Sequence, residues 1–570
     1  MNGRGNNVKV MALWIAPLLF LLLFYFYPLA SILRVSFARA GTDFAEPFRA
    51  IFSSVGFRKV LGFTFYQAIL STLLTLCIGL PAAYLVARYR FRGKKLLMSL
   101  TAIPFVLPTV VVAAAFNALL GPRGLVNYAL MNMLDLNTPP IQVMNSLTAI
   151  LLAHVFYNTT IVLRMVGDYW SHIDPRISEA AYTLGANRWQ TLRKVVLPLL
   201  APAISAAALL VFIFNFTSFG VILILGGPRF ATIEVEIYNQ TISLFNLPIA
   251  AALSVIQLLC TLGFTILYTQ LTRRVTRPLN LRPVKYTQKR LTTWKSKIYA
   301  GLIFTFLGIL FIAPIFALAV RSFSSFAPSV SGPTGSDITI TTAYYQELAI
   351  NRRDSLFYVP PINAIMVSLG YAAITVLLAI ALGLPAAWYL ARESNRKISN
   401  ILDPLIMLPL GTSAVTLGLG FIIALGKPPL NLRASPLLIP LAHTLVAFPF
   451  VVRSLVPSIQ SIKPRIRHAA GVLGASPGDV FRRIDLPLVG RALIVAATFA
   501  FTISMGEFGA TALIARPEYP TIPLMIYRLI SQPGSLNYGQ AMALSTILML
   551  ITAFGMLAIE RFRIADIGEF

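Results

Sequence analysis

Long apolar runs recur along the whole chain and constrain its fold more than any other feature. A helix needs about 20 apolar residues to cross a hydrocarbon core of about 30 Å. Runs of that length alternate with short polar segments from one end of the chain to the other. Of 570 residues, 57% are hydrophobic and only 12% are charged, which is too little charged surface for a soluble globule. The sequence therefore predicts an all-α, polytopic membrane protein.

The pattern predicts 12 spans in two sets of six. The first set covers residues 10–33, 62–87, 96–120, 146–167, 196–223 and 248–272, and the second covers 298–320, 362–391, 400–425, 435–456, 486–514 and 540–559. The first run is longer than the apolar part of a signal peptide, about 7–15 residues, so we expect it to stay as a membrane helix. The loops at 122–145 and 225–247 are long enough for short helices that do not span.

Basic residues set the expected orientation. Cytoplasmic loops of membrane proteins are enriched in Lys and Arg, and a cytoplasmic N-terminus puts most of the 47 basic residues on that side, for example Arg88, Arg90 and Arg92. The basic residues between Arg34 and Lys59 depart from this rule. Both termini are therefore expected in the cytoplasm. Because the positive charges lie in short blocks between apolar runs, the net charge of +27 does not indicate nucleic-acid binding.

A polar segment occurs twice, between the fourth and fifth spans of each set. The first copy reads Glu179-Ala-Ala-Tyr-Thr-Leu-Gly185 and the second reads His468-Ala-Ala-Gly-Val-Leu-Gly474, each followed after nine residues by a segment ending in Leu-Pro. The same offset relates His154 to His443 and Phe219 to Phe508. Since each set has an even number of spans, the copies share one orientation, which predicts two parallel six-helix repeats.

Capping residues predict that each copy forms a short helix, at about 174–186 and 463–475. In the first copy Asp174 can cap the helix, Pro175 suits its first position, and Gly185 suits a left-handed terminating residue. Asn187 with Gln190, and Ser476 with Asp479, can then cap the helix that follows. The paired alanines keep the helix surface free of bulk, which favours close approach by another protein.

With these motifs, the chain resembles the permease subunits of binding-protein-dependent ABC importers, whose motif is Glu-Ala-Ala, three residues, Gly, nine residues, Ile-x-Leu-Pro. The first copy has Val195 in place of Ile, and the second has His468 in place of Glu. The resemblance implies a type I permease of the bacterial cytoplasmic (inner) membrane. It also implies that both short helices dock on ATP-binding subunits, two copies in all, through Glu179, Ala180, Ala181, Gly185, His468, Ala469, Ala470 and Gly474. An extracytoplasmic solute-binding protein would be a further partner.

The domain organisation follows from the duplication. Residues 1–280 are expected to form the first permease half, 281–297 a basic cytoplasmic linker that also meets lipid headgroups, and 298–570 the second half. No Gly-x-x-x-x-Gly-Lys-[Ser/Thr] phosphate loop occurs in the sequence. We therefore expect a transport subunit that is not an enzyme and binds no cofactor, with ATP used by a partner.

Candidate pathway residues are few. Glu507 falls within the predicted eleventh span, where a charge is costly and often functional, and its repeat partner is Ser218, beside Phe219 and Phe508. Glu507 could attract a cationic substrate, or it could be an acid that packs the helices or locks a gate. His154 and His443 similarly fit either ligand binding or buried hydrogen bonding, and the phenylalanines at 212–219 fit packing better than a pore lining. The matched loops 226–234 and 517–522 suit a receptor-facing or gate position.

Several functions remain open at this point. The segments 150–158 and 232–238 look most like the thiamine and iron(III) permease group, and the choice between these two substrates stays open. Twelve spans in parallel halves also fit an ion-gradient-driven secondary transporter, although few acids lie within spans for ion coupling. A membrane-embedded enzyme fits worse, because the sequence has no catalytic carboxylate pair and no metal-ligand cluster.

Overall fold

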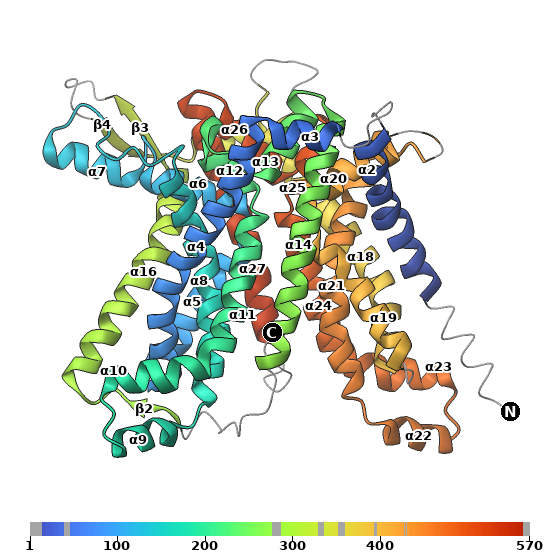
Figure 1. Cartoon of the computed structure of the whole chain (residues 1–570). Helices are drawn as coiled ribbons and strands as arrows, with labels where there is room; N and C mark the ends of the chain where they lie inside the picture. Colours follow the sequence, from blue (N-terminus) through green and yellow to red (C-terminus); the bar gives the residue numbers. More distant parts are fainter. Residues whose placement is uncertain are drawn as a thin grey trace. The chain divides into compact units, whose positions relative to one another are not determined.

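The computed structural model describes residues 14–38, 46–275, 287–328, 336–351, 359–392, 396–426, 428 and 430–562. Nearly all of these residues are helical, and two small strand pairs occur in loops (Figure 1). The all-α prediction is therefore confirmed at the level of the fold class. The predicted basic linker 281–297 lies partly outside the described residues.

In the described part of the chain, 11 helices are long and apolar enough to cross a membrane, or up to 12 if one bent pair counts as a span. These helices are Trp14–Phe37, Val55–Arg88, Thr109–Leu134, Leu147–His172, Arg188–Phe216, Leu247–Thr272, Trp294–Ser322, Pro361–Arg392, Leu438–Gln460, Pro477–Gly506 and Ser535–Ile559, with the bent pair at Leu402–Gly411 and Ala414–Leu425. The prediction of 12 spans agrees with this number if the bent pair is counted as one span. The first apolar run forms a helix of full span length.

Four predicted spans are interrupted where a continuous helix was expected. The third breaks at Leu107, which Pro108 holds in an extended conformation between α5 (Lys94–Val106) and α6 (Thr109–Leu120). The ninth bends by 96° before Ser413, whose hydroxyl caps the next helix. The fifth and eleventh end at Phe216 and Gly506, each followed by a short helix. Glu507 therefore lies in a break between helices and not within a span.

The elements of the first half follow the predicted order, with short helices in the two long loops at 122–145 and 225–247. In addition to α5 and α6, they are η1 (Leu22–Phe26), α2 (Tyr27–Ala38), α3 (Glu46–Ser53), α4 (Val55–Arg88), α7 (Leu125–Leu134), α8 (Leu147–His172), α9 (Pro175–Thr183), α10 (Arg188–Thr191), η2 (Leu192–Val196), α11 (Leu197–Phe216), α12 (Gly220–Leu225), η3 (Gly227–Arg229), α13 (Ile233–Tyr238), η4 (Asn239–Ser243) and α14 (Leu247–Val275).

The second half repeats this order after the linker. Its elements are α16 (Trp294–Ser322), α17 (Ala343–Gln346), η5 (Glu347–Ala349), α18 (Pro361–Arg392), α19 (Arg396–Met407), η6 (Leu408–Gly411), α20 (Ala414–Leu425), η7 (Leu432–Ala434), α21 (Leu438–Gln460), α22 (Pro464–Val472), α23 (Pro477–Val480), η8 (Phe481–Asp485), α24 (Leu486–Gly506), α25 (Gly509–Ile514), α26 (Ile522–Ser531) and α27 (Ser535–Phe562).

The repeated Gly-Leu-Pro-Ala-Ala segments are sites of close helix packing. A Cβ atom on Gly79 of α4 would lie 2.7 Å from Val162 Cβ of α8, and one on Gly383 of α18 would lie 2.5 Å from Val451 Cγ1 of α21. These glycines let the helix backbones approach, which is how small residues stabilise helix pairs in membranes. The same helix pair is therefore built twice, by matched residues.

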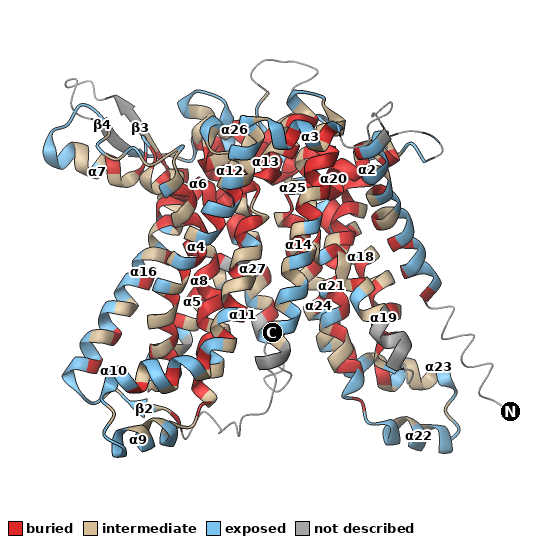
Figure 2. Cartoon of the chain, viewed as in Figure 1, coloured by how far each residue is buried: buried red, intermediate tan, exposed pale blue. Residues whose placement is uncertain are grey.

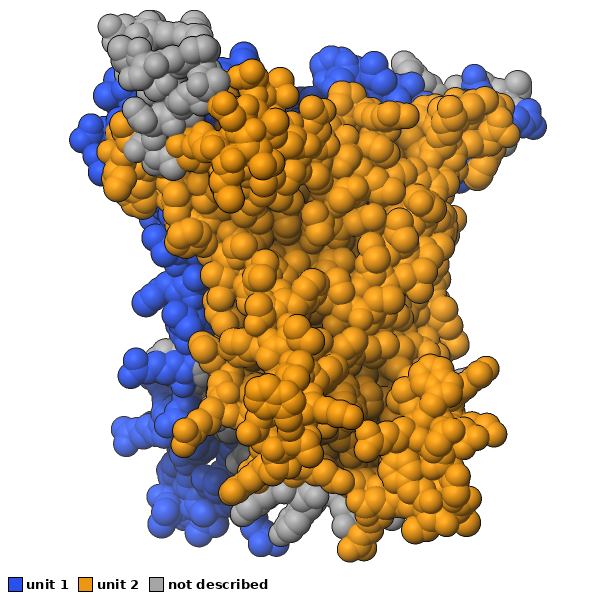
Figure 3. Space-filling view, turned by 90° about the vertical axis from the view of Figure 1, so that its left-hand side faces the viewer, with its two compact units in different colours: residues 1–50, 237–255, 342–570 blue, residues 51–236, 256–341 orange. Residues whose placement is uncertain are grey.

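The chain forms two compact units that differ from the sequence halves (Figure 3). One contains residues 1–50, 237–255 and 342–570, and the other contains residues 51–236 and 256–341. In the first unit, α2 of the first half packs against α20 of the second, and Tyr25 Oη lies 2.8 Å from Thr412 Oγ1. In the other unit, α16 of the second half packs against α6 of the first.

Two strand pairs join segments in loops. β1 (Tyr89–Arg90) pairs in parallel with β2 (Lys289–Arg290), so the end of the linker binds to the segment that follows α4. β3 (Ser324–Pro328) and β4 (Ser336–Ile340) form an antiparallel hairpin in which Ser324 is opposite Ile340. Neither pair was predicted, because strands of two to five residues give almost no periodic signal.

Candidate functional site

The first repeated polar segment forms α9, an exposed helix at one end of its unit. Asp174 Oδ1 accepts a hydrogen bond from the Arg176 backbone N–H at 3.0 Å, and Pro175 occupies the first turn. Gly185 ends the helix with φ +85°, and the Ala186 N–H donates to the Ala181 carbonyl at 3.0 Å. The predicted cap, first position and terminating glycine are all confirmed.

The second repeated segment forms α22 with the same ending but a different beginning. Gly474 has φ +83°, and the Ala475 N–H donates to the Ala470 carbonyl at 3.0 Å. Lys463 stands at the N-cap position and its side chain makes no capping hydrogen bond. Ser476 caps the following helix as predicted, accepting a hydrogen bond from the Asp479 N–H at 3.2 Å.

Neither short helix contains a buried residue (Figure 2). The repeated spacing also presents matched apolar side chains, which are not among the candidate residues predicted from the sequence. Leu184 is 88% exposed and Leu473, its counterpart in the repeat, is 87% exposed, while Ile177 and Ile466 form a second exposed pair. Single exposed apolar residues are common on protein surfaces, so the observation that matters is that both leucines stand exposed at equivalent positions of the repeat. The sequence does show that a leucine precedes the terminating glycine in both copies, and this repeat could have identified Leu184 and Leu473.

Glu179 and His468 have different surroundings. Glu179 Oε1 lies 3.7 Å from Lys289 Nζ in the linker strand β2, and both side chains are more than half exposed. A pair this exposed contributes little to stability. His468 is exposed on α22. The acid of the first copy is thus adjacent to the linker, whereas the second copy has an imidazole at that position.

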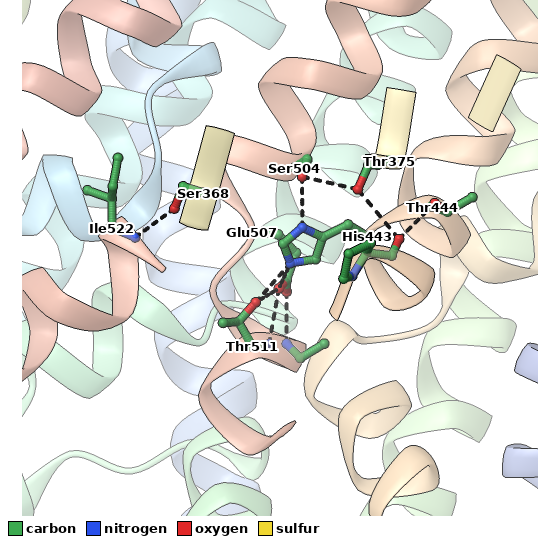
Figure 4. A network of polar contacts seen from close by, with 10 residues as sticks. Ser368, Thr375, His443, Thr444, Ser504, Glu507, Thr511 and Ile522 are labelled. Atoms are coloured by element: carbon green, nitrogen blue, oxygen red, sulfur yellow. Dashed lines mark hydrogen bonds and ion pairs between the residues drawn. The ribbon is translucent and has the colours of Figure 1, made fainter. Parts of the chain in front are cut away.

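Glu507 lies at the break between α24 and α25, inside a buried polar network of its own unit (Figure 4). Its Oε1 accepts from the Ala510 N–H at 2.8 Å, and its Oε2 accepts from the N–H and the hydroxyl of Thr511 at 3.1 and 2.6 Å. His443 Nε2 lies 3.3 Å from the same Oε2. The carboxylate therefore caps α25, and its oxygens are engaged by groups of the chain.

The donors in this network can be assigned from the hydroxyl protons. Because the Thr511 hydroxyl donates to Glu507, its oxygen accepts from His443 Nε2 at 2.9 Å, which places a proton on Nε2. His443 Nδ1 lies 2.8 Å from Ser504 Oγ, and the Ser504 hydroxyl donates in turn to Thr375 Oγ1 at 3.3 Å. Both ring nitrogens of His443 are thus within hydrogen-bond distance of a buried hydroxyl group. This agrees with the interpretation of His443 as a buried hydrogen-bonding residue.

The first half has an equivalent network without an acid. His154 Nδ1 lies 2.9 Å from Ser71 Oγ, and His154 Nε2 lies 2.9 Å from Ser218 Oγ at the break after α11. Asn158 Nδ2 donates to Asn215 Oδ1 at 2.7 Å. Each histidine thus holds a broken span in place through hydroxyl groups. Ser218 and Glu507 occupy equivalent breaks, as the repeat predicts.

The aromatic candidates pack within their units. Phe219 and Phe508 are buried next to the two breaks, and Phe508 lies 5.6 Å from the Tyr527 ring. Phe212 and Phe216 contact each other and Phe264. These contacts agree with the packing interpretation of the cluster. Among the described residues, no group of three or more His, Cys, Asp or Glu side chains is placed to hold a metal ion.

Comparison with known proteins identifies the family. Residues 76–277 and 379–564 each match the model of the binding-protein-dependent transport system inner membrane component. The chain belongs to this family. It is a fused permease with two copies of the family domain, and it is a multi-pass inner-membrane protein of the ABC importer type. This membership decides against an ion-gradient-driven secondary transporter.

The chain is similar to several permeases over nearly its full length. It is 29% identical to the thiamine transport system permease protein ThiP of Brucella abortus (strain 2308), covering 89% of this chain and 87% of the relative. It is 25% identical to ThiP of Escherichia coli (strain K12), with 88% of each chain covered. A probable ABC transporter permease protein, y4fN of Sinorhizobium fredii, is 26% identical over 94% of this chain and 93% of its own.

A crystal structure of a bacterial ABC transporter that imports the acidic polysaccharide alginate is also similar. The match has 19% sequence identity and a TM-score of 0.41, and it covers 48% of this chain and 98% of the other chain.

Proposed function

We propose that this permease carries thiamine into the cytoplasm by alternating access, driven by ATP hydrolysis on separate subunits that dock on α9 and α22. The observation that carries the docking assignment is the matched exposure of two capped helices with Leu184 and Leu473 in equivalent positions. An apolar side chain on a rigid, exposed helix end suits insertion into a groove of a partner. Two such helices suit two ATP-binding subunits.

The substrate assignment is supported by the names of relatives that align with nearly the entire chain. Thiamine is favoured over iron(III) on this basis. A solute-binding protein would deliver it from the other side of the membrane. The matched loops 226–234 and 517–522 each follow the short helix after a broken span, α12 or α25, and are candidates for this contact. Both termini are assigned to the cytoplasmic side, from the distribution of basic residues.

Gly185→Val and Gly474→Val test the docking assignment. Both glycines have left-handed backbones and open space around an added Cβ, so the variants strain only the helix ends. An L-residue in this conformation costs about 1–2 kcal/mol, more for a β-branched one. The double variant is expected to lose co-purification of the ATP-binding subunit and to lose uptake of labelled thiamine.

Gly490→Val is the matched control, because Gly490 is helical and also has no heavy atom within 4 Å of an added Cβ. It should bind the ATP-binding subunit and transport thiamine like the parent chain. Undiminished thiamine uptake by the double variant would overturn the docking assignment. Uptake of iron(III) but not thiamine by the parent chain would overturn the substrate assignment alone.

A further inference from the structure

Asp485 is a buried acid that none of the assignments above uses. It is the last residue of η8, directly before α24, and only 2% of it is exposed. Its Oδ1 accepts from Arg467 Nε at 2.7 Å and its Oδ2 accepts from Arg392 Nη2 at 3.0 Å. Arg467 belongs to α22 and Arg392 ends α18. One carboxylate thus joins the exposed helix to two membrane helices of the same unit.

Trp388 completes this cluster. The guanidinium carbon of Arg392 lies 4.2 Å from the Trp388 ring centroid and that of Arg467 lies 5.8 Å from it. The Phe481 ring packs edge-on against the same indole at 5.1 Å. Guanidinium groups over an indole face are attracted to it. The guanidinium groups of Arg392 and Arg467 therefore both lie near the Trp388 ring. The Asp485 carboxylate between them offsets the repulsion of their positive charges.

The cluster matters because α22 has no buried residue of its own. Most surface helices are fixed by burying an apolar face, whereas the apolar residue buried next to α22 is Ile462, which precedes the helix. Arg467 is the least exposed ionic side chain of α22, with 18% of it accessible, and its hydrogen bond to Asp485 is short and charge-assisted. Arg467 therefore gives α22 a short ionic attachment to the buried acid Asp485.

The first half is built differently at the equivalent positions. Val196 stands where Asp485 does, and it lies in an apolar cluster with Trp170 and Ile173. Ser178 stands in place of Arg467. The ionic cluster is thus specific to the second half, whose motif has His468 in place of the acid.

We propose that Asp485 is the positioning residue of α22: it transmits displacement of this helix to α18 and α24 through Arg392, Arg467 and the η8 turn. This inference rests on the proposed function, in which α22 docks on an ATP-binding subunit. Without the carboxylate, two guanidinium groups would face each other unpaired, and α22 would separate from the membrane helices. ATP hydrolysis would then continue with less transport.

Asp485→Asn tests the proposal, since it removes the charge and keeps the shape. Asp479→Asn is the matched control, because Asp479 is a half-exposed acid in the preceding turn whose pairing with Arg483 spans 3.8 Å. In the full complex with its ATP-binding and solute-binding partners, thiamine imported per ATP hydrolysed should fall roughly tenfold in Asp485→Asn, a typical size for coupling between sites. It should be unchanged in Asp479→Asn.

A distance measurement on the full-length permease alone tests the positioning without any partner. Nitroxide labels on Leu473→Cys and Leu488→Cys, with Cys77 and Cys260 changed to Ser, report the position of α22 relative to the start of α24. The distance distribution should broaden in Asp485→Asn and stay narrow in Asp479→Asn. A narrow distribution in Asp485→Asn overturns the proposal whatever the transport result. If the parent chain binds no ATP-binding subunit, the proposed function fails, and the distance measurement still decides the role of Asp485.

The double variant Asp485→Val with Arg467→Ser covers the case in which Asp485→Asn does not fold. It installs the residue pair of the first half and removes one of the unpaired cations. The double variant should fold, show a broad distance distribution and import less thiamine per ATP. Parental values for both measurements would overturn the proposal.

Discussion

At the scale of single residues, Glu507 illustrates how a buried charge is accommodated beside a membrane. The carboxylate lies where α24 ends, so the free N–H groups of α25 are available to it, and Thr511 and His443 supply the remaining donors. A buried carboxylate is tolerated when it is hydrogen-bonded in this way. The arrangement supports a structural, gate-locking role for Glu507 over attraction of a cationic substrate, and that role is a proposal.

Glu507→Gln separates the two roles. In glutamine one of the two carboxylate oxygens is replaced by an NH2 group, which cannot accept a hydrogen bond. Either the Ala510 N–H or the N–H and hydroxyl of Thr511 therefore lose their acceptor. A lost buried hydrogen bond costs about 1–3 kcal/mol, so the melting temperature of the purified permease should fall. The KM for thiamine should be unchanged.

Glu518→Gln is the control for this measurement, because Glu518 is an exposed acid paired with Arg516 at 3.2 Å. Its melting temperature should equal that of the parent. A raised KM in Glu507→Gln with an unchanged melting temperature would instead assign Glu507 to the substrate pathway.

At the scale of elements, prolines accompany three of the irregular turns in the membrane helices. The π-helical turns η1, η2 and η8 each precede a proline, namely Pro28, Pro198 and Pro487. A proline ring clashes with the carbonyl four residues earlier, and in all three cases that carbonyl lies inside the π turn. The wider turn relieves the clash. In η8 it also places Asp485 towards Arg392 and Arg467.

The linker strand is a second element whose attachment can be tested. Thr287 is buried and its hydroxyl donates to the Ser171 carbonyl, while Gln288 Nε2 donates to the Val86 carbonyl at 3.2 Å. Thr287→Val removes the first of these bonds and leaves a buried carbonyl without its donor, at a cost of about 1–3 kcal/mol. Amide hydrogen exchange in β1 and β2 should become faster.

Thr292→Val is the control, since Thr292 is exposed in the same segment. Its exchange pattern should match that of the parent. Equal protection of β1 and β2 in Thr287→Val and the parent would show that the strand pair does not depend on this hydrogen bond.

At the scale of the whole molecule, each compact unit combines helices from both sequence halves. α2 packs in the unit of the second half, where a Cβ atom on Gly420 would lie 2.9 Å from Pro28 Cβ. α16 packs in the unit of the first half, where Tyr299 Oη donates to the Pro81 carbonyl at 2.8 Å. Neither half therefore completes a unit alone.

This exchange predicts that the two halves assemble when the chain is split. Fragments 1–280 and 281–570, co-expressed with a tag on one, should purify together from detergent, and each should be degraded when expressed alone. Gly420→Val in the second fragment should weaken the recovery, because it forces α2 away from α20. Gly370→Val, in open space on α18, should not. Stable, separate fragments would contradict the prediction.

Local patterns in the sequence were sufficient for the fold class, the number of spans, the duplication and the two exposed helices. Each depends on interactions within a few residues, such as the cap at Asp174 and the left-handed glycines Gly185 and Gly474. The resemblance carried by those motifs also identified the family correctly. The breaks at Leu107 and before Ser413 were missed, because apolar length alone does not distinguish a continuous helix from a broken one.

Only the tertiary structure decided which side chains meet. Glu507 was placed within a span by its apolar neighbours, yet its donors come from α25 and from His443, far away in the sequence. Asp485 stood in a recognised motif, but its partners lie on α18 and α22. Contacts of this kind depend on how helices pack against one another. The hydrophobic periodicity of a single sequence predicts each helix but not which helices pack together. The sequence by itself therefore determined the architecture and the family, and packing decided how the buried charges are paired.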